Sequence, residues 1–279
     1  MKIIKTIDEL RANLKKSKIE GKSIGLVPTM GYLHEGHASL IRKARSENDI
    51  VVVSDFVNPI QFGPNEDLLT YPRDLEADSK ICEEIGVDYI FAPEASEMYQ
   101  DRKVFVDIED MSDHLCGAKR PGHFRGVLTV CSKLFNITGA DRAYFGQKDA
   151  QQVAIIKKLV SDLNIPIEII PCPIVREEDG LALSSRNTYL SSEDRKAALC
   201  LSKAIFAGEK LAKEGGSVEE VIGKMREIID SEELSKIDYI SVVALKTMED
   251  ASDFDVDRLV AIAVYIGKTR LIDNFIYRS

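Results

Sequence analysis

The feature that most constrains the fold is an almost wholly apolar, β-branched run at Asp49–Val57 (DIVVVSDFV). A strand that is apolar on both sides of its pleat is buried on both faces, as in a parallel sheet covered by helices. Strand-like runs recur at Ser23–Pro28, Val87–Ala92, Arg142–Phe145 and Ile167–Ile170, and helical spacing of apolar residues at His37–Glu47, Leu75–Ile85, Val127–Ile137 and Ala150–Leu163. This alternation predicts right-handed βαβ crossovers and an α/β fold with a doubly wound parallel sheet.

The pattern changes after about Arg176. Two long helical stretches, Ser192–Glu214 and Ser217–Ser231, precede three strand-like runs at Asp238–Ala244, Arg258–Tyr265 and Thr269–Phe275. We therefore expect a first domain over residues 1–175 and a smaller C-terminal α+β domain over residues 176–279. The polar segment Arg176–Gly180 (REEDG) is suited to a hinge between them.

Composition narrows the classes of partner. The 279 residues carry a net charge of −9, which disfavours a broad nucleic-acid surface but leaves room for a nucleotide bound by a few donors in a cleft. No apolar run approaches the roughly 20 residues that span a bilayer, and the first residues lack the apolar core of a signal peptide. We expect a cytoplasmic protein without a membrane partner. The five scattered cysteines are expected to be reduced and structural.

The segment Pro28–His37 (PTMGYLHEGH) follows the first strand and opens the first helix. Its glycines allow close backbone approach, and the N–H groups of a helix start attract phosphate. His34 and His37 are three residues apart and project to one side of a helical turn, where they could stabilise charge during phosphoryl or nucleotidyl transfer. Two alternatives stay open. The histidines could satisfy backbone carbonyls, or bind zinc, although this spacing supplies only two ligands.

Three further loops carry candidate residues. Gln61 lies in Asn58–Asp67 (NPIQFGPNED) after the second strand, where an amide could bind a hydroxy acid or simply face solvent. Lys148 and Asp149 lie in Tyr144–Gln152 (YFGQKDAQQ), where they could bind phosphate and a ribose hydroxyl or Mg²⁺, or only start a helix. Leu181–Asn187 (LALSSRN) offers two hydroxyls and a guanidinium, either as a polyphosphate clamp or as an ordinary loop.

Taken in order, these segments resemble the pantothenate synthetase (pantoate–β-alanine ligase) family over essentially the whole chain. The matching stretches are PTMGYLHEGH, FVNPIQFGPNED with YPRD, RPGHFRGVLTV, YFGQKDAQQ, LALSSRN and RLIDN. The resemblance implies a Rossmann-like first domain, a mobile C-terminal domain, a homodimer, and condensation of pantoate with β-alanine using ATP and Mg²⁺ through a pantoyl adenylate. No nucleic acid is implied as a partner.

The resemblance also implies the role of each site residue. His34, His37 and Lys148 would be catalytic, with His37 as the general acid. Gln61 and Gln152 would bind pantoate, and Gln61 would also lie by the β-alanine site. Mg²⁺ would arrive with ATP, near Asp74 or Asp149, without a dedicated protein site. The ATP site would be formed by Met30, Gly31, Tyr32, Leu33, His34, Glu35, Gly36, His37, Gly146, Gln147, Lys148, Asp149, Val175, Leu183, Ser184, Ser185 and Arg186.

Two departures from the family pattern are small. The family often has alanine where this chain has Tyr32, which could narrow the pocket mouth, and glutamate where it has Gln147. Three other functions remain alternatives at this stage: a nucleotidyltransferase that stops at adenylyl transfer, a class I aminoacyl-tRNA synthetase, and a nucleotide-binding regulatory protein. The short acidic chain disfavours the second, and the intact histidines, Lys148 and Ser184–Arg186 disfavour the third.

Overall fold

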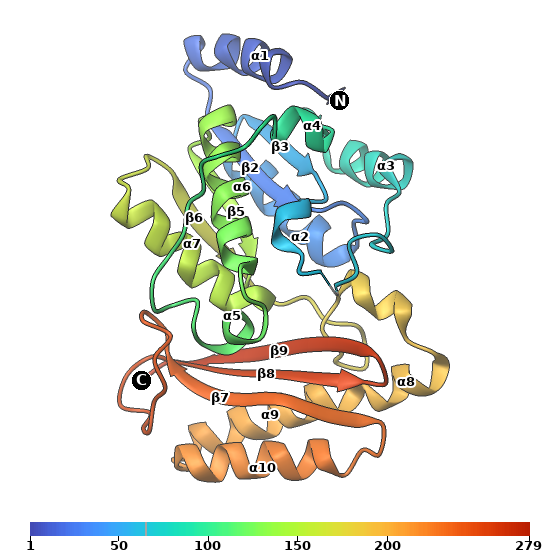
Figure 1. Ribbon diagram of the computed structural model, residues 1–279, viewed down its shortest axis with the longest axis vertical. Helices are drawn as coiled ribbons and strands as arrows, with labels where there is room; N and C mark the ends of the chain where they lie inside the picture. The colour runs from blue at the N-terminus through green and yellow to red at the C-terminus, as the bar shows by residue number, and fades with distance from the viewer. Residues whose placement is uncertain (65) are drawn as a thin grey trace. The chain divides into compact units, whose positions relative to one another are not determined.

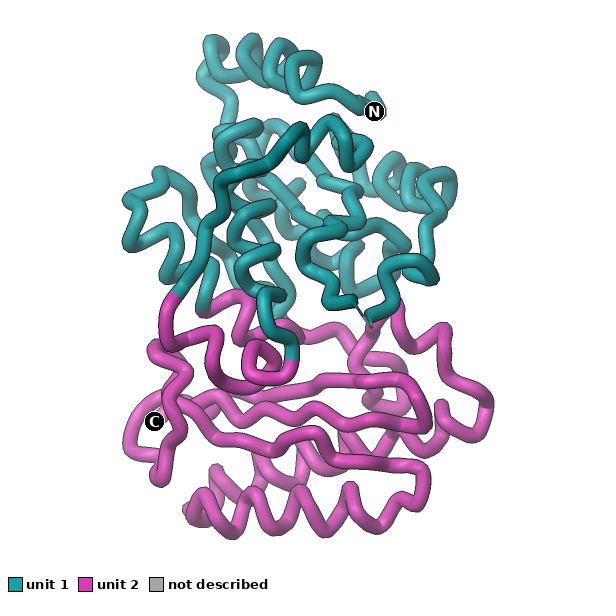
Figure 2. Tube along the Cα trace, in the orientation of Figure 1, with its two compact units in different colours: residues 1–108, 120–147, 155–173 teal, residues 109–119, 148–154, 174–279 magenta. Residues whose placement is uncertain are grey.

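The structure is a computed structural model that describes residues 1–64 and 66–279. The chain forms two compact units, each assembled from segments that are separate in the sequence (Figure 2). The first unit contains residues 1–108, 120–147 and 155–173, and the second contains residues 109–119, 148–154 and 174–279.

The first unit is built on a six-stranded parallel sheet with the order β1-β4-β3-β2-β5-β6 (Figure 1). Its strands are β1 (Lys2–Ile4), β2 (Ile24–Thr29), β3 (Ile50–Asp55), β4 (Tyr89–Phe91), β5 (Arg142–Gly146) and β6 (Glu168–Cys172). From β2 the chain proceeds outward to β3 and β4, whereas β5 and β6 extend the sheet on the other side of β2. The direction of winding therefore reverses between β2 and β5, the place where doubly wound sheets bind ligands beyond their carboxyl ends.

Helices cover both faces of this sheet. Val27, Val51 and Val53 pack with Leu40 and Ile41 of α2 (Glu35–Glu47), and Cys82 of α3 (Leu75–Ile85) belongs to the same cluster. Residues that alternate with these along a strand point to the opposite face. On that face α6 (His123–Thr138) contacts β2 and also α1 (Ile7–Ile19). The buried strands are thus apolar on both sides because both sides are covered.

The remaining helices include short ones and the C-terminal pair. They are α4 (Ala95–Met98), α5 (Leu115–Lys119), α7 (Ala150–Asp162), α8 (Ser192–Ala197), α9 (Leu199–Lys213) and α10 (Val218–Asp230), with 3-10 turns η1 (Pro59–Gln61), η2 (Gln147–Asp149) and η3 (Ser185–Tyr189). In the second unit, α9 and α10 pack on an antiparallel sheet of β7 (Ser235–Ala244), β8 (Arg258–Ile266) and β9 (Thr269–Tyr277). The predicted fold class, a doubly wound α/β sheet with an α+β part, is confirmed.

Two details differ from the expectation. The first residues form a strand and a helix, β1 and α1, that were not predicted; β1 has only three residues, which is too short to show a period. The single helix expected over Ser192–Glu214 is two, α8 and α9, which meet at Ala198. In the part of the chain that the structure describes, no helix is long and apolar enough to cross a membrane.

We predict that Gly126→Ala lowers the free energy of unfolding by roughly 2–3 kcal/mol through overpacking. A methyl group there would lie 2.4 Å from the Ile60 carbonyl oxygen and 2.6 Å from Gln61 Cα, which are backbone atoms that cannot rotate away. Gly223 in α10 is the matched control, since a methyl group there meets nothing within 4 Å. Gly223→Ala should stabilise by about 1 kcal/mol. Equal effects in urea denaturation would contradict this account of α6 packing.

Candidate active site

The loop after β2 carries the histidines and has an unusual backbone conformation. Gly31 and Tyr32 both lie in the left-handed region, with φ of 75° and 52°. A non-glycine residue in that region is strained and persists only where its surroundings fix it. Asp78 supplies that fixation, because its carboxylate accepts from the Tyr32 N–H at 2.7 Å and the Leu33 N–H at 2.6 Å. Thr29 adds a contact, with its hydroxyl oxygen accepting from the Gly31 N–H.

His34 and His37 are oriented by the start of α2. His34 is the N-cap, and its Nδ1 accepts from the Gly36 N–H at 3.1 Å. His37 Nδ1 accepts from the His34 N–H at 3.4 Å, and the two ring centroids are 4.1 Å apart. A nitrogen that accepts carries no proton, so each neutral ring holds its proton on Nε2. The helix start therefore selects the tautomer in which Nε2 is a donor for an oxyanion.

Gln61, the predicted acid-binding residue, is buried and its amide is oriented on both sides. The Asn58 Nδ2 donates to Gln61 Oε1 at 2.9 Å, and Gln61 Nε2 points at the Met30 sulfur at 3.2 Å. Asn58 is in turn fixed by the Tyr99 hydroxyl, which donates to its Oδ1, and by the Gly126 carbonyl. These contacts bring the histidine loop and the Gln61 loop together within the first unit.

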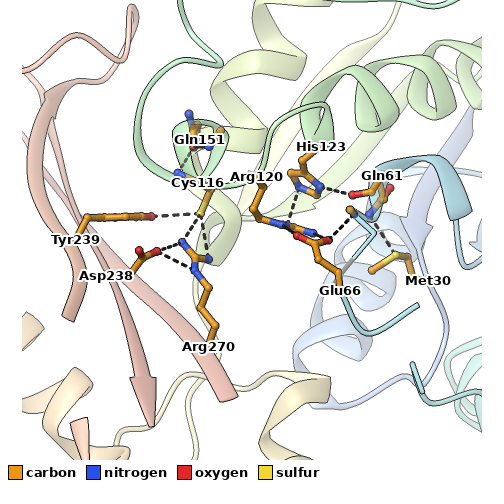
Figure 3. Close-up of polar contacts among 12 residues, drawn as sticks. Met30, Gln61, Glu66, Cys116, Arg120, His123, Gln151, Asp238, Tyr239 and Arg270 are labelled. Atoms are coloured by element: carbon orange, nitrogen blue, oxygen red, sulfur yellow. Dashed lines mark hydrogen bonds and ion pairs between the residues drawn. The ribbon is translucent and has the colours of Figure 1, made fainter. Parts of the chain in front are cut away.

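A charged cluster fixes the backbone on the other side of Gln61 (Figure 3). Arg120 donates two hydrogen bonds to Glu66, at 2.6 and 2.7 Å, and also contacts His123 Nε2. His123 Nδ1 lies 2.8 Å from the Gln61 carbonyl oxygen. Burial alone would raise the pKa of Glu66, but the hydrogen bonds and charge of Arg120 outweigh it and hold that pKa below the usual range. The cluster is thus an ion pair that anchors a loop.

Gly146 ends β5 and Gln147 follows it in the first unit, and Lys148 and Asp149 continue the same chain in the second. Lys148 Nζ lies 3.3 Å from the Asp149 carboxylate. Within the second unit the Asn274 amide donates to the Lys148 carbonyl at 2.9 Å, and the neighbouring Asp273 forms a two-bond ion pair with Arg176. The RLIDN segment of β9 therefore supports the lysine segment.

The other predicted nucleotide residues of the second unit lie on one folded-back segment. The Leu183 N–H donates to the Val175 carbonyl, and Arg176 bridges to Ala182. Ser184 caps η3 by accepting from the Arg186 N–H at 3.3 Å, and Ser185 is buried. These contacts bring Val175, Leu183, Ser184, Ser185 and Arg186 close together.

The adjacent glutamines of α7 have different surroundings. Gln151 is buried and holds the segment before and within α5, donating to the Met111 and His114 carbonyls and accepting from the Cys116 N–H. Its role is structural. Gln152, the predicted pantoate residue, is half-buried on the first turn of the helix.

Cys116 belongs to a second cluster drawn in Figure 3, and it is one of five free cysteines. Its sulfur lies 3.2 Å from the Tyr239 hydroxyl and 3.6 Å from the Arg270 guanidinium, which is paired with Asp238. Burial raises the pKa of the Tyr239 phenol well above its usual value. The cluster ties α5 to the sheet of the second unit.

The two carboxylates that were predicted to lie near Mg²⁺ both have partners within the protein. Asp74 is the N-cap of α3 and accepts from the Ala77 N–H, and Asp149 pairs with Lys148. Across residues 1–64 and 66–279 there is no group of three or more His, Cys, Asp or Glu side chains that could hold a metal ion.

The sequence singles out the histidines, Met30 and Gln61 as candidates but not the residues that hold them. Asn58, Glu66, Arg120 and His123 were noted only as members of loops, and Asp78 was assigned no role. The signal that could have pointed to them was weak: an Asn-Pro and an Arg-Pro-Gly, each at a loop start. Their partners lie far apart in sequence, so no local pattern pairs them.

The fold and these contacts define a Rossmann-like α/β protein with a histidine-bearing loop at the switch point of its sheet. The family model described as pantoate-beta-alanine ligase matches residues 2–276. Curated relatives named pantothenate synthetase include one from Clostridium acetobutylicum, 59% identical over 99% of each chain, and one from Ruminiclostridium cellulolyticum, 57% identical over 99% of this chain and 98% of the relative.

Solved structures agree. Pantothenate synthetase from Thermus thermophilus superposes with a TM-score of 0.95 at 44% identity, covering 100% of both chains. The pantoate-beta-alanine ligase from Francisella tularensis, described as complexed with beta-gamma ATP and beta-alanine, has a TM-score of 0.82 at 40% identity, covering 99% of this chain and 98% of that one. The chain belongs to the pantoate–β-alanine ligase family.

We predict that Arg120→Ala lowers the free energy of unfolding by roughly 2–3 kcal/mol at pH 7, because it leaves Glu66 half-buried and unpaired. The two side chains are only 17% and 24% exposed. The Lys80–Glu76 pair is far more exposed, at 67% and 83%, so Lys80→Ala is the control and should change stability by less than about 0.5 kcal/mol.

The pH dependence gives a second test of the same pair. The lowered pKa of Glu66 means that its contribution is present above the ordinary glutamate pKa and is lost as pH falls through the folded-state pKa. The difference between wild type and Arg120→Ala should therefore shrink in acid. A constant difference from pH 7 to pH 3 in denaturant titrations would contradict the ion-pair assignment.

Proposed function

We propose that this chain condenses pantoate with β-alanine using ATP, through a pantoyl-adenylate intermediate, releasing AMP and pyrophosphate. Family membership supports the ligation. The observation that carries the adenylation step is the histidine pair at the start of α2, whose Nε2 atoms are donors at the sheet's switch point. Donors aimed at developing phosphate charge are what nucleotidyl transfer requires.

The chemistry explains why ATP is consumed. A free carboxylate is a poor acyl donor, because its leaving group would be oxide. Attack of the pantoate carboxylate on the α-phosphorus expels pyrophosphate and converts that oxide into AMP. The amine of β-alanine then attacks the acyl carbon and AMP leaves. Both steps depend on positioning and charge stabilisation.

In the first unit, we assign Met30 through His37 to ATP, with His34 and His37 on the phosphates and His37 as general acid. Gly146 and Gln147 line the nucleotide at the end of β5. Gln61 binds pantoate, with part of its surface toward β-alanine. This assignment is supported by the amide of Gln61, which is buried and oriented and can hydrogen-bond a carboxylate or a hydroxyl without adding charge.

In the second unit, we assign the remaining nucleotide contacts to Lys148, Asp149, Val175 and Leu183–Arg186, and pantoate to Gln152. Lys148 stabilises charge on the phosphates. Mg²⁺ is assigned to the triphosphate itself, where it would neutralise charge. On the likeness to the family, we also propose domains at 1–175 and 176–279, the second a mobile lid that protects the adenylate from water, in a cytoplasmic homodimer.

We predict two separable half-reactions, because no side chain described here is required as a covalent carrier of the acyl group. With ATP, Mg²⁺ and pantoate but no β-alanine, the protein should release a stoichiometric burst of pyrophosphate and retain pantoyl adenylate. Adding β-alanine should then produce pantothenate detectable by mass. Pyrophosphate release that strictly requires β-alanine would rule out the adenylate route, and release without any amide product would indicate adenylyl transfer alone.

We predict that Gln61→Glu raises the KM for pantoate by roughly 30- to 1,000-fold, since a lost hydrogen bond and a new anion oppose the substrate carboxylate. The KM for ATP should change much less. The matched control is Gln100→Glu, the same change at an exposed residue, which should leave both constants unaltered. Steady-state kinetics decide this, and an equal loss of ATP affinity in Gln61→Glu would move Gln61 out of the acid pocket.

A further inference from the structure

Two acidic side chains lie close together beneath the histidine loop. Asp55 is the last residue of β3, and Asp78 lies in the first turn of α3 and is 2% exposed. A methyl group built on Gly31 would lie 2.3 Å from Asp55 Oδ1 and 3.2 Å from Asp78 Oδ2. The carboxyl pair is therefore packed directly against the loop, and only glycine leaves it room.

The contacts decide which carboxyl carries the charge. Asp78 accepts from the N–H groups of Tyr32 and Leu33, and an ionised carboxylate is the stronger acceptor. Two carboxylates packed against the same glycine cannot both be ionised without strong repulsion. The proton of the pair must then reside on Asp55, which donates to Asp78.

We propose that Asp55 is a positioning residue that acts as a neutral carboxylic acid. Its O–H orients Asp78, Asp78 fixes the left-handed turn at Gly31 and Tyr32, and that turn sets the start of α2 from which His34 and His37 project. The kinetic consequence rests on the proposed function, whereas the proton itself does not.

The surroundings support a protonated Asp55 near neutral pH. Burial raises the pKa of Asp55 to about 7, and the charge and hydrogen bond of Asp78 act in the same direction. Burial also raises the pKa of Asp78, but the N–H groups of Leu33 and Tyr32 and the hydrogen bond from Asp55 oppose that rise.

The other titratable groups that act on the pair are Asp74, the N-cap of α3, and Cys82 on the next turn. The loop presents backbone N–H groups to the pair. Among the described residues, neither carboxyl forms an ion pair with a lysine or arginine, so a proton is the neutralising partner. When pH rises through about 7, Asp55 loses that proton, the donated hydrogen bond disappears and a second negative charge faces the first.

The kinetic experiment compares wild type with Asp55→Asn and Asp55→Ala from pH 6 to pH 9. An asparagine keeps the donor at every pH, so its KM for ATP should stay flat. The wild-type KM should climb above pH 7, by up to about tenfold per unit. Asp55→Ala lacks the donor and should have a raised KM at every pH. Asp162→Asn, the same change at an exposed aspartate on α7, should follow the wild-type profile.

A thermal-unfolding series tests the proton without substrate. Folded Asp55 keeps its proton where the unfolded chain has lost it, between the ordinary aspartate pKa and about 7. Stability is therefore lost as pH rises through that window, and the loss is complete above 7. The melting temperature of Asp55→Asn should rise relative to that of wild type between pH 5 and pH 7. Above pH 7 the difference between the two melting temperatures should stay constant.

The outcomes separate the two proposals. Parallel melting and KM profiles for wild type and Asp55→Asn would overturn the neutral-acid role. So would an Asp55→Asn variant as impaired as Asp55→Ala. A wild type that melts as expected but makes no pantothenate would refute the proposed function and leave the protonated pair intact.

Discussion

The histidine loop depends on one interaction: the Asp78 carboxylate accepts hydrogen bonds from two backbone N–H groups. The loop must turn sharply between the end of β2 and the start of α2, and it does so with Gly31 and Tyr32 in left-handed conformations. Tyrosine there costs of order 1–3 kcal/mol, which the local surroundings must offset. Two charge-assisted hydrogen bonds are of the right strength to do that. Once the turn is fixed, the capping contacts at His34 and His37 follow from helix geometry.

The fold was largely predictable because its signals are local. The expected helix at Leu75–Ile85 is α3 residue for residue, and Val51–Val53 were predicted as doubly buried and are. The misses are also physical. The strand β1 is stabilised by pairing with β4, a partner 87 residues away in sequence that no period of two can reveal. The break between α8 and α9 at Ala198 is not marked by a glycine or proline in the sequence.

The candidate site was predictable only in part, because sequence patterns are local and many of its contacts are not. Motif residues such as His34 and Gln61 occur in segments that are unusual on their own. The residues that orient them are ordinary in their segments: Asn58 reads as a turn, Arg120 as a loop cation, and Asp55 as one polar position in an apolar strand. Their roles depend on partners such as Gly126 or Asp78, which come close only when the chain folds. Spacing can locate a motif, but it cannot supply the contacts that give the motif its geometry.

These contacts share an electrostatic logic. The proposed reaction brings a carboxylate to a triphosphate on a chain that is itself acidic, with a net charge of −9. Near the first unit's motifs, three positions are arranged so that they add little negative charge. Glu66 is paired with Arg120, Asp55 carries the proton in the proposal above, and Gln61, which we propose binds the acid, is an amide rather than a carboxylate. The Asp78 carboxylate beneath the loop accepts from two backbone N–H groups. A site can therefore bind anions on an acidic protein when its local charges are cancelled, because in a partly buried site near groups act more strongly than the distant net charge.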